Sequence, residues 1–98
     1  MKIDATKTDA KLIISLSGRL DTTTAPDLES KLSESLDGVK ELVFDMKELE
    51  YVSSAGLRVL LSTQKTMNKA GSMVLKNVDS SVMEVFEITG FVDILTIE

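Results

Sequence analysis

A short stretch of the chain, YVSSAGLRVLL from Tyr51 to Leu61, joins an apolar, strand-like segment directly to a helix. The apolar residues beyond the turn have the spacing of one face of an α-helix, and they are Leu57, Leu60, Leu61 and Met67. We therefore predict that a helix begins at about Ser54. The rest of the chain is interpreted as the support for this turn.

Two serines, Ser53 and Ser54, stand where this helix starts. The first N–H groups of a helix have no partner inside it, and the helix dipole places partial positive charge there, so anions are stabilised at this end. A serine in this position either caps the helix, which is worth roughly 1 kcal/mol, or serves as a switch. One serine is enough for a cap, and the residues alone leave both interpretations open.

The chain before the turn predicts a hairpin and a helix. Lys2–Thr6 and Lys11–Ser17 are strand-like segments separated by polar turn residues, so the sheet begins with an antiparallel edge strand. Thr22–Thr24 gives a helix-capping signal, and Pro26 falls in the first helical turn. Three leucines then recur at every fourth position, namely Leu28, Leu32 and Leu36. Gly38 ends this helix.

A central strand is predicted at Glu41–Met46, where a continuous apolar run is typical of a parallel strand covered on both faces. Lys47–Glu50 has the composition of a solvated turn. Leu49 and Tyr51 are expected to point inward from this turn.

The remaining elements follow the predicted central helix. Ser72–Lys76 is a further strand, and Asp79 and Ser80 can cap a third helix that ends at Thr89–Gly90. Phe91–Ile97 is expected to form a fifth strand or a strand-like tail against the sheet edge. Two overlapping right-handed βαβ crossovers result. We predict an α/β fold over residues 1–98 as one domain, a mixed, mostly parallel sheet of about four or five strands covered by about three or four helices.

Functional residues of such a fold gather outside the carboxyl ends of the parallel strands. Ser53 and Ser54 lie there, the loop from Asp21 to Thr24 leaves a strand for a helix in the same way, and Asp45 stands near the end of the predicted central strand. We expect these segments to converge. For Asp21 and Asp45, capping of turns and loops is an equally good explanation.

The composition of the chain excludes several classes of function. A net charge of −5 and a pI near 4.7 argue against binding a nucleic acid backbone. The chain has no cysteine and no histidine, which removes thiolate chemistry, Ser-His-Asp catalysis and ordinary zinc or iron sites. We expect no catalysis, no cofactor and no metal. No apolar stretch is long enough to span a bilayer, and we expect a cytoplasmic protein without membrane insertion.

Three segments resemble the STAS domain family, named for sulfate transporters and anti-sigma factor antagonists. LVFDMKELEYVSSAGLRVLL resembles the core motif of the bacterial antagonists, ISLSGRLDTTTAPDL their strand before the first helix, and ITGFVDILTIE their closing helix, glycine and strand. The resemblance implies that Ser54 is the phosphorylated serine. The aspartate that usually precedes this serine is Ser53 here, which makes Ser53 a rival acceptor.

The resemblance also implies a function: an anti-sigma factor antagonist that sequesters an anti-sigma factor and so frees a sigma factor. The partner would be a serine kinase whose phosphorylation of the antagonist ends binding, and a serine phosphatase would restore the active form. The partner surface would then comprise Asp21, Thr22, Thr23, Ser53, Ser54, Gly56 and Arg58. Asp45 and Ala55 would form the surroundings of the phosphorylated serine.

Other functions remain open at this point. A STAS scaffold or transport-accessory domain would use the same face to dock constitutively on a partner. An enzyme could hold a hard divalent cation between Asp21, Asp45 and Ser54. Weak nucleotide binding at the helix N-terminus has a physical basis but no motif.

Overall fold

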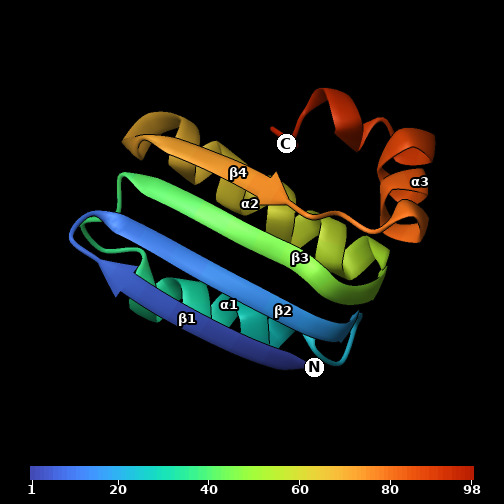
Figure 1. Ribbon diagram of the computed structural model, residues 1–98, viewed down its shortest axis with the longest axis horizontal. Coiled ribbons are helices and arrows are strands. Elements are labelled where there is room, and N and C mark those ends of the chain that lie inside the picture. The colour runs from blue at the N-terminus through green and yellow to red at the C-terminus, as the bar shows by residue number, and fades with distance from the viewer.

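One four-stranded sheet in the order β1-β2-β3-β4 organises the computed structural model, which describes residues 1–98 (Figure 1). The strands are β1 (Lys2–Thr8), β2 (Lys11–Leu20), β3 (Glu41–Val52) and β4 (Ser72–Lys76). The helices are α1 (Ala25–Ser35), α2 (Ser54–Ala70) and α3 (Ser80–Thr89), followed by the 3-10 turn η1 (Phe91–Asp93). β1 pairs with β2 antiparallel, and the other neighbours are parallel. The predicted mixed α/β sheet with an antiparallel edge strand is confirmed.

Helices α1 and α2 lie on one face of the sheet, behind the strands in Figure 1. The reason is topological: both crossovers move the chain in the same direction along the sheet, and two right-handed crossovers of that kind place their helices on the same side. The helices that were expected to lie on the sheet therefore cover one face of the central strand, although residues on both of its faces are buried. On the other face Val43 is buried, and it is in register with Ile13 of β2 and Val74 of β4.

The predicted apolar stripes of the two helices form the core on the covered face. Leu28 and Leu32 of α1 are buried, as are Leu57, Leu60 and Met67 of α2. Full burial of one such side chain contributes about 1.5–3 kcal/mol. The stripes therefore fix which way each helix faces, and with it the direction in which the start of α2 points.

β3 is longer than the sequence suggests, because the strand continues through Lys47–Glu50 to Val52. The prediction of a turn at Lys47–Glu50 is wrong. This half of β3 stays paired with β2, and the pairing has two register irregularities, between Ser15 and Ser17 and between Gly18 and Arg19. Leu49 is buried as expected, but Tyr51 is 38% exposed, so its predicted inward orientation is wrong.

The C-terminal part completes one end of the sheet. β4 pairs only with the first half of β3, and α3 packs beside the second half and buries Val82 and Phe86. After η1, the N–H of Leu75 donates to Thr96 O at 2.9 Å and the N–H of Glu98 donates to Leu75 O at 2.9 Å. The strand-like tail predicted for Phe91–Ile97 is confirmed only for its last residues, because Phe91–Asp93 form η1, and no full fifth strand forms. No helix is long and apolar enough to cross a membrane.

Candidate functional site

The ends of β2 and β3 bring two of the predicted site segments together. Leu20 and Val52, the last residues of the two strands, are in register, and the N–H of Ser53 donates to Leu20 O at 2.8 Å. The loop that begins at Asp21 and the helix that begins at Ser54 therefore leave the sheet side by side. The expected convergence of these two segments is confirmed.

The two serines at the start of α2 have different environments. Ser53 is the N-cap residue, with extended backbone, and its Oγ accepts the N–H of Gly56 at 3.4 Å. Ser54 is the first helical residue; its side chain is exposed and makes no hydrogen bond. Ser53 thus satisfies the need for a cap and leaves the hydroxyl of Ser54 free.

The loop after β2 is held by the carboxylate of Asp21. Its Oδ1 accepts the N–H and Oγ1–H of Thr23, at 3.1 and 2.8 Å, and the N–H of Thr24 at 3.1 Å. The hydrogen bond from the Thr23 hydroxyl is the main cause that lowers the pKa of Asp21 below its ordinary value, and the Thr24 and Thr23 N–H groups add to it. The capping role considered for Asp21 is therefore real, and the site keeps a fixed negative charge at neutral pH.

Sequence reasoning missed a pair of side chains at the same strand ends. The guanidinium of Arg19 lies 4.1 Å from the centroid of the Tyr51 ring, and its Nε lies 3.9 Å from Asp21 Oδ2. Arg19 and Tyr51 are in register across β2 and β3. Nothing in the local sequence reveals this contact, because it depends on the register beyond the irregularity between Gly18 and Arg19.

A shallow depression of about 270 Å³ opens beside Ser54, between the starts of α1 and α2. Its lining residues are Thr22, Ala25, Pro26, Glu29, Ala55, Arg58 and Val59. Thr22, Ala55 and Arg58, all predicted for the site, therefore border one hollow. Thr23 is exposed nearby and hydrogen-bonded to Asp21. Ala25, Pro26 and Glu29 of α1 and Val59 of α2 were not predicted for the site, because the sequence does not reveal that the two helices start side by side.

Gly56 lies beneath this surface. A Cβ at Gly56 would meet Leu20 Cγ at 2.6 Å and Val52 Cγ2 at 3.0 Å. The residue is buried, and the lack of a side chain lets α2 start tightly against the ends of the two strands. Gly56 was predicted as part of the partner surface, but it is buried, and the fold itself occupies the space that a side chain would need.

The sequence model of the STAS domain matches residues 2–98. The chain belongs to the STAS domain family. It is 39% identical to BtrV of Bordetella bronchiseptica, a candidate anti-sigma factor antagonist, over 99% of this chain and 85% of BtrV. It is 30% identical to the anti-sigma-B factor antagonist of Bacillus subtilis, over 99% of this chain and 90% of the relative.

A solved structure has the same fold. The structure of the Bacillus cell fate determinant SpoIIAA in the phosphorylated form superimposes with a TM-score of 0.76, covering 99% of this chain and 91% of SpoIIAA at 20% identity. At that identity the likeness concerns the fold. The resemblance deduced from the three sequence segments is thereby confirmed at the level of the family.

Asp45 does not belong to this site of the STAS domain, and the prediction that it stands near the end of the central strand is wrong. It lies in the first half of β3, and the strand continues for roughly 20 Å beyond it. Its Oδ1 accepts the N–H of Lys47 and the Nδ2–H of Asn77, both at 3.1 Å. Asp45 therefore joins β3 to the loop after β4. It is too far from Asp21 and Ser54 to share a cation with them, and no group of acidic residues has the arrangement of a metal site.

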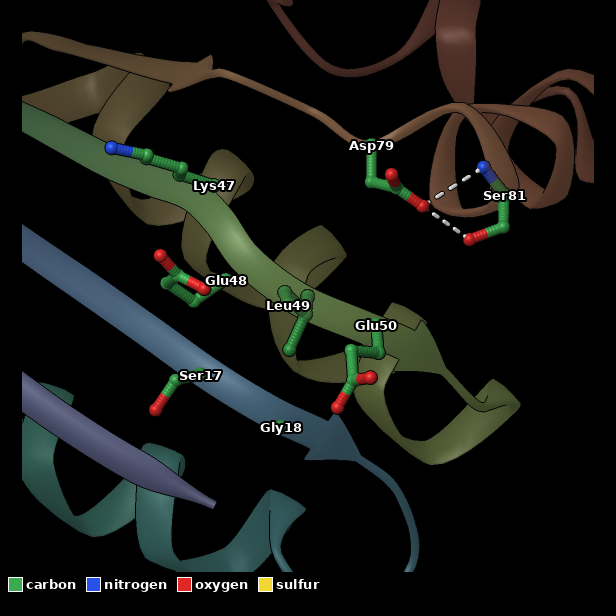
Figure 2. A pocket seen from close by; sticks show the side chains of 8 residues that line it. All are labelled: Ser17, Gly18, Lys47, Glu48, Leu49, Glu50, Asp79 and Ser81. Carbon is green, nitrogen blue, oxygen red and sulfur yellow. Dashed lines mark hydrogen bonds between the residues drawn. The ribbon is translucent and has the colours of Figure 1, made fainter.

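The largest depression of the STAS domain, about 590 Å³, lies elsewhere, on the open face of the sheet (Figure 2). Ser17 and Gly18 of β2, residues 47–50 of β3, and Asp79 and Ser81 line it. Figure 2 shows Asp79 turned to the N–H and hydroxyl of Ser81, so this carboxylate caps α3. None of the predicted site residues borders this depression.

Proposed function

We propose that this STAS domain is an anti-sigma factor antagonist whose binding is switched off by phosphorylation of Ser54. The observation that carries the proposal is the division between the two serines: Ser53 Oγ caps α2, whereas the Ser54 hydroxyl is exposed and free of hydrogen bonds. The names of the relatives in Bordetella and Bacillus support the antagonist role, and the phosphorylated form of SpoIIAA supports the switch.

The proposed partner is an anti-sigma factor that is also a serine kinase. It would bind the surface formed by the start of α2 and the loop after β2, with Asp21, Thr22, Thr23, Ser53, Ser54 and Arg58 in contact. The kinase would transfer the γ-phosphoryl group of ATP to Ser54 Oγ, with the hydroxyl proton passing to a base of the kinase and ADP leaving. A serine phosphatase would hydrolyse the ester. The antagonist itself would be a substrate and a binder without catalysis.

The physical basis of the switch is local. A phosphate adds about −1.5 to −2 charges at pH 7 and three acceptor oxygens. The start of α2 tolerates this charge, because the N–H groups of Ser54 and Ala55 precede the first hydrogen bond of the helix, from Leu57 N–H to Ser53 O at 2.9 Å. The fold is therefore kept. A partner packed over Ser54 would instead meet new bulk and a charge added beside the carboxylate of Asp21.

The experiment that tests this proposal is phosphate mapping. The protein and its Ser53→Ala and Ser54→Ala variants are incubated with ATP and the serine kinase encoded nearest to it, and the phosphorylated residue is located by mass spectrometry. We expect one phosphate on Ser54, retained in Ser53→Ala and lost in Ser54→Ala. Phosphate on Ser53 or on the threonines of residues 22–24 would refute the assignment. No phosphate at all, with the partner still bound, would favour a constitutive scaffold role.

A further inference from the structure

Arg58 is the cation best placed to meet a phosphate on Ser54. The two residues are four positions apart on α2, so their side chains lie one above the other on the same side of the helix. A side chain in a helix leans toward the N-terminus, which directs Arg58 back over the turn that contains Ser54. Arg58 also borders the 270 Å³ depression together with Ala55, the neighbour of Ser54.

Arg58 makes no ion pair, so its guanidinium is free to bind an anion. Its side chain is exposed, and no carboxylate lies within 4.0 Å of it, although Glu29 borders the same depression. Arg19, the other arginine at the site, is occupied by the ring of Tyr51 and lies near Asp21 Oδ2. Of the two arginines at the site, Arg19 therefore already has partners, whereas Arg58, which lies on the same helix as Ser54, has none.

We propose that Arg58 binds the phosphate of phosphorylated Ser54 within the same molecule. This inference rests on the proposed function of Ser54. The guanidinium would donate charge-assisted hydrogen bonds to the phosphate oxygens, while the first N–H groups of α2 approach them from the helix end. Phosphorylation then has two effects on the partner surface: it adds a dianion at Ser54, and it withdraws the unpaired cation of Arg58 that the unphosphorylated form presents.

The test measures the phosphate directly, without a kinase or a partner. Phosphoserine is incorporated at position 54 during translation, and its second pKa is followed by 31P NMR in the parent protein, in Arg58→Gln and in Lys65→Gln. Lys65 is a matched control, because it is exposed and makes no ion pair. It lies on the same helix about 16 Å along the axis from Ser54, which is beyond the screening length at 0.15 M salt.

We expect the second pKa in Arg58→Gln to exceed that of the parent by about 0.5 unit, because a nearby cation favours the dianion and exposure weakens the effect. Lys65→Gln should match the parent within about 0.1 unit, as expected for a charge beyond the screening length. An unchanged pKa in Arg58→Gln, or an equal shift in both variants, would overturn the inference. This readout is independent of the proposed function, since a kinase that ignores Ser54 would refute that proposal and leave the titration as it is.

Discussion

The Oγ of Ser53 accepts the backbone N–H of Gly56 at 3.4 Å, and Ser54, one residue further on, takes no part in capping. The two serines should therefore differ in their effect on stability. Ser53→Ala should lower the free energy of unfolding by about 0.5–1 kcal/mol, toward the low end for an N-cap because the bond is long. Ser54→Ala should stay within about 0.5 kcal/mol of the parent. Urea denaturation of the two variants compares them, and a larger loss for Ser54→Ala would contradict this division.

Gly56 should be sensitive to even one added carbon. Gly56→Ala favours the helix by about 1 kcal/mol but forces a Cβ against Leu20 Cγ, and overpacking typically costs about 1–3 kcal/mol, so we expect a net loss of up to about 2 kcal/mol. Combining it with Leu20→Ala provides the control. The new methyl group then enters the space that Leu20 vacates, and the double variant should lose less stability than the sum of the single losses. Simple additivity would show that the clash is not with Leu20.

The hydroxyl of Thr23 should control the titration of Asp21. Its hydrogen bond is the main cause of the lowered pKa, so Thr23→Ala should raise the pKa of Asp21 toward 3.8, its ordinary value. The sign for stability follows: a group whose pKa is lower in the folded state contributes above its unfolded pKa, and the contribution is lost as the pH falls through the folded pKa. The carboxyl 13C shift of Asp21 in an NMR titration measures the change. An unaltered pKa would mean that the N–H donors alone set it.

Removal of metal ions should leave the protein unchanged. The apolar faces of α1, α2 and the sheet close a core of aliphatic side chains, and the acidic residues form no ligand cluster. We expect the same melting temperature with and without EDTA. A decrease of several degrees in EDTA would reveal a metal site and would reopen the enzyme alternative.

Much of the fold follows from local patterns in the sequence. The start of α2 at Ser54 was predictable because the helical spacing of Leu57, Leu60 and Met67 begins directly after two good capping residues. The hairpin between β1 and β2 and the stripe at Leu28 and Leu32 were predictable for the same kind of reason. Each of these features is encoded within a few neighbouring residues.

The errors concern features set by partners in the sheet. Lys47–Glu50 has the polarity of a turn, but pairing with β2 keeps it extended. Asp45 therefore lies within β3, far from the end of the strand where the site was predicted. Tyr51 is apolar enough to be taken for a core residue, yet it stacks on Arg19 at the surface. The identity of the capping serine likewise depends on the geometry of the turn, which two adjacent serines in a sequence do not reveal.

The central claim is that a phosphate on Ser54 ends partner binding without disturbing the fold. The measurement is the affinity of the anti-sigma factor for the unmodified protein and for protein phosphorylated at Ser54, by calorimetry, with circular dichroism of both forms as the control. Burying a dianion against a packed surface costs several kcal/mol, so we expect the affinity to fall by about 100-fold or more while the spectra and melting temperatures stay alike. Equal affinity of the two forms would contradict the account, as would a loss of binding that accompanies unfolding.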